Sequence, residues 1–267
     1  RTMSLIKPFR GLRPAPGRAA EIAAPPYDVL SAEEARLIVH AGAAGKPHSF
    51  LHISKAEIDL PPEIDHYSPP VYAKSRENFD RMIREAVLKQ DDAPCYYAYR
   101  LTMGEHVQTG LVAAASVADY DSNRIRKHEF TRPDKEDDRV RQIEALNAQT
   151  GPVLLAHPDA PEVDSLLAQA SAGEPDADVT ADDGIRHTLW AIRDAAVLQR
   201  LTFAFDAMPA LYIADGHHRS AAASRVAAAR RASCSRPAST VTTATIVTQR
   251  ANSLGWNWKP SPGRVSQ

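Results

Sequence analysis

The chain has 267 residues, and its 32 Lys and Arg against 33 Asp and Glu give a formal net charge of -1, which argues against a protein that coats nucleic acid or an anionic membrane through bulk charge. Its two cysteines form no CxxC pair, which argues against a zinc ribbon or a disulfide scaffold. No apolar run reaches the roughly 18 residues of a membrane helix, so we expect a cytoplasmic protein.

The first 90 residues mix helical and extended patterns. Ser31 and Glu34 form a capping box, which predicts a helix from about Ala32. Residues 48–54 (HSFLHIS) predict a short strand. Apolar residues recur at helical spacing within residues 74–90 and predict a second helix there.

The remainder alternates hairpins with helices. Residues 95–117 predict a hairpin that turns at Gly104, and Thr131 with Asp134 forms a second capping box before a helix that Gly151 can end. The elements expected after it are a strand over residues 152–157, a helix over 160–171, a hairpin over 179–194 turning at Asp183-Gly184, a helix over 194–205, a strand over 210–216 and a helix over 219–231. This order predicts an α+β fold, a mixed sheet with packed helices.

The composition changes after Arg231. Residues 232–267 contain no Asp or Glu and are rich in Thr, Ser and Pro. We therefore divide the chain into an α+β domain over residues 1–231, truncated at its C-terminal end, and an atypical tail over 232–267, either disordered or frameshifted. Within that tail, TVTTATIVTQ (240–249) has the propensity to form one strand.

The stretch YIADGHHRSAAA (212–223) predicts an anion site at a strand-to-helix junction. Gly216 permits a sharp turn and a close approach to the backbone. The free N–H groups at a helix start favour an anion. Arg219 can bind a phosphate through two N–H groups, and His217 and His218 can donate hydrogen bonds or move a proton.

Two alternatives stand beside the anion site. The Asp-Gly pair could be an ordinary turn with packing histidines around it. A histidine-based zinc site is the other alternative, although the sequence shows no third ligand at a suitable spacing. Mg²⁺ held by Asp215 together with a phosphate fits the residue types better.

Two more stretches carry candidate residues. His128 and Glu129 precede the second capped helix and could meet the phosphate turn. If a phosphoryl group is transferred, a carboxylate must orient the attacking hydroxyl, and Glu129 is the first candidate with Asp215 the second. Tyr27 could stack on a base, and Asp28 could bind a sugar hydroxyl or an amine. The plain alternatives are a solvated loop and a rigid entry to the first helix.

The strand–DGHHR–helix pattern resembles the signature of the ParB/sulfiredoxin superfamily, in which a turn containing glycine and arginine binds nucleotide phosphates. The DGHHR form is most similar to the free-serine kinases of that superfamily. His217 stands where a sulfiredoxin carries its catalytic cysteine, so a sulfinic acid reductase is not expected. More specifically, the chain resembles the family called domain of unknown function 1015, also labelled SpoOJ/ParA/ParB/RepB family proteins. The stretches that carry this resemblance are KPFRGLRP (7–14), APPYDVLS (24–31), FLHISKAEIDLP (50–61), RKHEFTRPDKEDDR (126–139) and IADGHHRSAAA (213–223).

The resemblance implies a ParB/sulfiredoxin-like core that binds a nucleoside di- or triphosphate with Mg²⁺. It extends to a phosphotransferase, ATP- or ADP-dependent, that acts on a small hydroxylated metabolite such as serine, with a homodimer as a further expectation. One alternative is a ParB-like DNA-associated nucleotide switch, against which the balanced charge and the lack of a basic helix-turn-helix pattern weigh. The other is a non-catalytic nucleotide or metabolite sensor.

Overall fold

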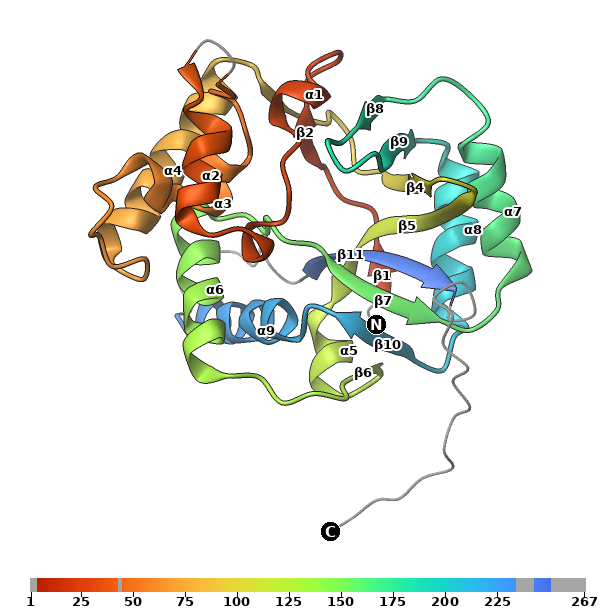
Figure 1. Ribbon diagram of the computed structural model, residues 1–267. Coiled ribbons are helices and arrows are strands. Elements are labelled where there is room, and N and C mark those ends of the chain that lie inside the picture. The colour runs from red at the N-terminus through yellow and green to blue at the C-terminus, as the bar shows by residue number, and fades with distance from the viewer. Residues whose placement is uncertain (1–3, 43–44, 234–242, 251–267) are drawn as a thin grey trace.

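A computed structural model describes residues 4–42, 45–233 and 243–250, and in the last range the backbone. One mixed sheet runs through the molecule, and among the described residues nine strands pair in it (Figure 1). Its strands are β1 (Ile6–Lys7), β4 (Tyr96–Met103), β5 (His106–Ser116), β6 (Ile125–Arg126), β7 (Val153–His157), β8 (Ala177–Thr180), β9 (Arg186–Ile192), β10 (Leu211–Asp215) and β11 (Thr243–Arg250). They follow the order β6-β10-β7-β11-β5-β4-β9-β8, and β1 pairs with the C-terminal end of β5.

The sheet is mixed because two of its neighbouring pairs, β6 with β10 and β7 with β11, run parallel. The other neighbours are antiparallel. A separate ribbon pairs β2 (Leu12–Pro14) with β3 (Leu88–Gln90). The predicted α+β class, with a mixed sheet and packed helices, is therefore confirmed.

Helices pack on both sides of this sheet (Figure 1). They are α1 (Ala19–Ile22), α2 (Ala32–Val39), α3 (Leu51–Ser54), α4 (Pro69–Arg84), α5 (Val117–Asp121), α6 (Pro133–Leu146), α7 (Pro161–Ala170), α8 (Ala195–Asp206) and α9 (His217–Ala232), with the 3₁₀ turns η1 (Tyr27–Val29) and η3 (Ala56–Asp59). On one side, α7 and α8 bury Leu166 and Phe205 in the main core together with strand residues such as Tyr96 and Leu155. On the other side lie α2, α3 and α4, with smaller cores of their own.

Helix α9 packs on α6 because its sequence is rich in alanine. Ala222 and Val226 are buried against Ile143 of α6. Small side chains let two helix backbones approach closely, and the residues C-terminal to the DGHHR turn provide them. The packing fixes the start of α9 relative to α6, and this contact positions the site described below.

Several predicted elements are confirmed. Both hydrogen bonds of the Ser31–Glu34 capping box are present at the start of α2. The first hairpin turns at Gly104, which has a φ of 58°, and the second turns at Gly184, with a φ of 81°. Strand propensity in the tail is also confirmed, because β11 begins at Thr243.

Two predictions in the N-terminal part are wrong. Residues 48–54 do not form a strand but end in the short helix α3, where the backbone N–H of Leu51 donates to Ser49 Oγ and the Ser54 hydroxyl donates to the carbonyl of Phe50. The helix predicted over residues 74–90 begins earlier, at Pro69, because proline suits the first helical position. It ends at Arg84, and the chain then turns into β3.

The second capping box is also wrong. The residue that caps α6 is Arg132, and Thr131 instead bonds its hydroxyl to Glu136 Oε2 at 2.8 Å. Pro133 opens the helix without a side-chain cap. The helix ends at Leu146, where Asn147 takes the left-handed conformation, so Gly151 is free for another role.

Part of the chain singled out by composition lies outside the described residues. Of the tail predicted over 232–267, the structure describes residues 232–233 and 243–250. Among the helices of the described ranges, none combines the length with the apolar character that crossing a bilayer requires.

Candidate functional site

Parallel pairing of β6 with β10 brings two distant segments together. Leu211 lies beside Ile125 and Tyr212 beside Arg126, so both strands end at the same edge of the sheet. Residues 127–132 leave β6 there, and α9 leaves β10 there. The predicted meeting of His128 and Glu129 with the DGHHR turn follows from this register.

The turn itself depends on Gly216. This residue caps α9 with φ 97° and ψ 34°, a left-handed conformation that side chains rarely adopt. A Cβ at this position would lie 2.9 Å from Nε of Arg219, because the arginine folds back over the turn. Its guanidinium bonds the carboxylate of Asp215. A Cβ on Gly151 would lie 2.9 Å from Cδ of the same arginine. Two glycines therefore make room for one side chain.

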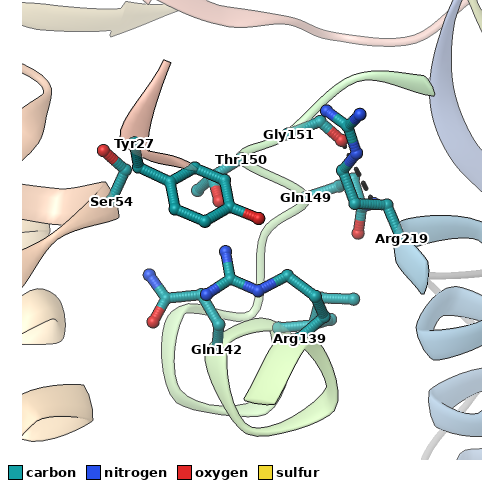
Figure 2. Close-up of a pocket in the computed structure, with 9 residues that line it drawn as sticks. Tyr27, Ser54, Arg139, Gln142, Gln149, Thr150, Gly151 and Arg219 are labelled. Atoms are coloured by element: carbon teal, nitrogen blue, oxygen red, sulfur yellow. Dashed lines mark hydrogen bonds between the residues drawn. The ribbon is translucent and has the colours of Figure 1, made fainter. Parts of the chain in front are cut away.

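Arg219 lines a cavity of about 350 Å³ between α9, α6 and the N-terminal helices (Figure 2). The cavity is lined by Tyr27, Ser54, Arg139, Gln142, Ile143, Gln149, Thr150, Gly151 and Arg219. The guanidinium of Arg139 lies over the Tyr27 ring, 4.5 Å from its centroid. In Figure 2 the Tyr27 hydroxyl points into the space between the two arginines. Two cationic groups from different helices thus face one hollow.

The two arginines differ in how firmly their charges are held. Arg139 and its partner Asp138 are both largely buried, and Tyr72 donates its hydroxyl to the same carboxylate. Burial alone would lower the pKa of Arg139, but Tyr27 and Asp138 hold it above its ordinary value. The Arg219 pair is looser, because the side chain of Asp215 is 70% exposed. Exposed pairs of this kind contribute about 0–1 kcal/mol, so Arg219 can exchange Asp215 for another anion at little cost.

His217, the first residue of α9, is buried next to the loop from β6. Its side chain is 4% exposed, and Nδ1 lies 3.4 Å from Oε2 of Glu129. The rings of His128 and His217 pack edge to face with centroids 4.5 Å apart. Burial, and then the charge of His128, lowers the pKa of His217, so its imidazole favours the neutral form. The described residues that line the cavity include none of these three.

The remaining predicted site residues take lesser places. His218 accepts a hydrogen bond at Nε2 from the backbone N–H of Arg132, 3.0 Å away, and so ties the start of α6 to α9. Its Nε2 is therefore not available to a phosphate. Asp28 is exposed on the turn η1 and is not one of the described cavity residues, whereas Tyr27 is.

Sequence reasoning missed Arg139, Gln149 and Gly151. Arg139 is the last residue of the RKHEFTRPDKEDDR stretch, which was examined for its acidic residues. Gln149 and Gly151 carry no signal in one sequence, since their roles arise only where the loop after α6 meets α9. The side-chain oxygen of Gln149 is buried without a hydrogen-bond partner, and its amide nitrogen lies 3.4 Å from the carbonyl of Gly151.

Fold and site together define an α+β protein whose cavity holds two arginines at the start of a glycine-capped helix. The chain belongs to the family described as protein of unknown function (DUF1015), whose sequence profile matches residues 6–254. The match includes β11 and so runs beyond Arg231. No curated protein and no solved structure matches the chain.

Proposed function

We propose that this protein binds the phosphates of a nucleotide in the cavity between Arg139 and Arg219. The observation that carries the proposal is the convergence of these two guanidinium groups at the N-terminus of α9. A helix of this length offers free N–H groups and the positive end of its dipole, and Gly216 lets a ligand approach them closely. Tyr27 supplies an aromatic ring at the opposite wall for a base or a sugar.

Binding would rearrange the pair between Arg219 and Asp215. A phosphate offers the arginine a stronger, two-point interaction than an exposed carboxylate does. Asp215, once released, could hold Mg²⁺ together with the phosphate, as Mg²⁺ usually binds through one or two carboxylates and phosphate oxygens. The donor set fits this ion only when the phosphate is present, since Asp215 has no second carboxylate beside it among the described metal-capable groups.

The proposal extends to phosphoryl transfer onto a small hydroxylated metabolite such as serine. This step rests on the similarity of the DGHHR turn to that of the free-serine kinases in the ParB/sulfiredoxin superfamily. The chemistry requires a carboxylate that orients the hydroxyl, and Glu129 and Asp215 are the two candidates beside the turn. The cytoplasmic location of such metabolites agrees with the location expected from the sequence.

The test is thermal unfolding with ATP, ADP, CTP or GTP and Mg²⁺, for the natural chain and for Arg219→Ala. A nucleotide at about 100 times its Kd stabilises a folded protein by about 2.7 kcal/mol, which a melting curve resolves. We expect one nucleotide to raise the Tm of the natural chain and not that of Arg219→Ala. Arg200→Ala is the control, because Arg200 pairs with Glu162 on the exposed surface of α8.

Two outcomes oppose the proposal. If a cooperatively melting natural chain shows no shift with any nucleotide, phosphate binding is wrong. If Arg219→Ala keeps the full shift, the site lies elsewhere. Where binding holds, incubation with labelled nucleotide and serine separates a kinase from a sensor, because a sensor binds without turnover.

A further inference from the structure

Three metal-capable side chains converge beside the cavity, at a point that phosphate binding by Arg219 does not require. The ligand atoms of His128, Glu129 and His217 all lie within 4.8 Å of one another. Ligands that share one ion, at bond lengths of about 2.1 Å, stand roughly 3–3.5 Å apart. The nitrogen–oxygen separation of 3.4 Å between His217 and Glu129 already meets this spacing.

His217 gives a second, independent sign of a ligand. Its side chain is 4% exposed, and Nε2 is buried with no hydrogen-bond partner. Native proteins pair nearly all such atoms, because leaving one unpaired costs about 1–3 kcal/mol. Half a turn of the ring about its Cβ–Cγ bond changes which nitrogen faces Glu129. An ion between the three side chains would use the lone pair that this imidazole now leaves unsatisfied.

The backbone holds the three groups in place without the ion. His128 and Glu129 follow β6, and His217 follows β10, and these two strands are hydrogen-bonded parallel neighbours. The edge-to-face contact of the two rings brings His128 against the buried histidine. The site is thus built on the ends of two paired strands, the kind of rigid support that metal sites need.

We propose that His128, Glu129 and His217 bind a divalent first-row transition metal ion such as Zn²⁺. Two imidazoles and one carboxylate suit zinc, iron or manganese, and they leave coordination positions open for water or a substrate. Mg²⁺ and Ca²⁺ fit poorly, because they prefer oxygen ligands. With the ion bound, Glu129 is a ligand, and orienting a hydroxyl falls to Asp215.

The test uses the full chain, stripped with a chelator and dialysed against Zn²⁺, followed by elemental analysis of the bound ion. Titration with Co²⁺ gives a visible spectrum that reports its ligands. We expect one ion per chain, and a Kd raised at least tenfold in Glu129→Gln and in His128→Ala. Both residues are exposed, so these variants keep their fold, as circular dichroism will show. His106→Ala, an exposed histidine at the start of β5, is the control and should bind as the natural chain does.

Three results would overturn the site. A folded natural chain that retains no stoichiometric Zn²⁺ would do so. So would equal Kd values for the natural chain, Glu129→Gln and His128→Ala. Displacement of Zn²⁺ by an equal concentration of Mg²⁺ would also do so, because nitrogen ligands do not favour Mg²⁺.

Discussion

At the scale of single residues, the site depends on the two glycines that surround Arg219. Gly216 and Gly151 make room for the same side chain, but for different reasons. Gly216 has a positive φ of 97°, so any other residue there is strained. Gly151 has no such constraint, and a Cβ there would meet only the flexible Cδ of the arginine, at 2.9 Å. One glycine serves the backbone, and the other serves the placement of the arginine.

This difference predicts opposite effects for two matched substitutions. Gly216→Ala should lower the free energy of unfolding by about 1–2 kcal/mol, the cost of a left-handed residue with a Cβ. Gly151→Ala should leave stability within about 0.5 kcal/mol but push Arg219 away and weaken nucleotide binding. Urea denaturation and the nucleotide-dependent Tm shift measure the two quantities. Equal stability losses in both variants would contradict this account.

At the scale of elements, a buried ion pair holds α3, η3 and α4 together behind the cavity. His52 of α3 places Nδ1 2.7 Å from Asp59 of η3, and its Nε2 faces the carbonyl of Lys46 at 3.2 Å. Both ring nitrogens therefore face oxygen acceptors, which holds His52 as the imidazolium. Asn78 of α4 donates to the same carboxylate at 2.8 Å. Burial raises the pKa of Asp59, but the bonds from His52 and Asn78 outweigh it and the net pKa is lowered.

A lowered pKa makes this pair a source of acid sensitivity. The carboxylate is favoured in the folded chain, so its stabilisation is present above the unfolded pKa of about 3.9 and is lost as the pH falls through the lower folded pKa. Asp59→Asn should cost about 2 kcal/mol at pH 7, because it leaves a buried cation without its counter-charge. In urea denaturation that difference should shrink below about pH 4.

The control is Asp182→Asn, whose partner Lys46 lies on the surface at 3.3 Å. An exposed pair of this kind should change stability by less than about 0.5 kcal/mol at any pH. If Asp59→Asn shows the same small, pH-independent effect, then His52 and Asp59 do not form a stabilising pair.

The same scale shows how far the sequence predicts this molecule. Local signals placed the helices and hairpins well where one residue decides the outcome, as with the Ser31 cap or the turn at Gly184. They failed at residues 48–54, whose apolar run suits a strand or a helix equally until the neighbouring helices bury it. They also failed to find Arg139 and Gly151 as cavity residues, because a cavity wall is made by tertiary contacts that no local pattern encodes. The DGHHR turn was found because its chemistry lies within five consecutive residues.

At the scale of the whole molecule, β11 joins the two halves of the sheet. It pairs with β5 on one side, where Ile246 lies beside Ala113, and with β7 on the other, where Ile246 lies beside Val153. The strands that carry the candidate sites, β6 and β10, belong to the β7 half. The hairpins lie in the β5 half. Backbone hydrogen bonds of β11 therefore hold the site-bearing strands to the rest of the sheet (Figure 1).

A chain shortened to end after Ser233 tests this role. Without β11, the edges of β5 and β7 that now pair with it expose their N–H and C=O groups, and such edges recruit strands from other chains. We expect the shortened chain to elute as oligomers or aggregates in size-exclusion chromatography and to lose its cooperative melting transition. A chain that ends at residue 254, where the family match ends, keeps β11 and should behave as the full chain does. A monomeric shortened chain with an unchanged Tm would mean that the two halves hold together without β11, through helix packing alone.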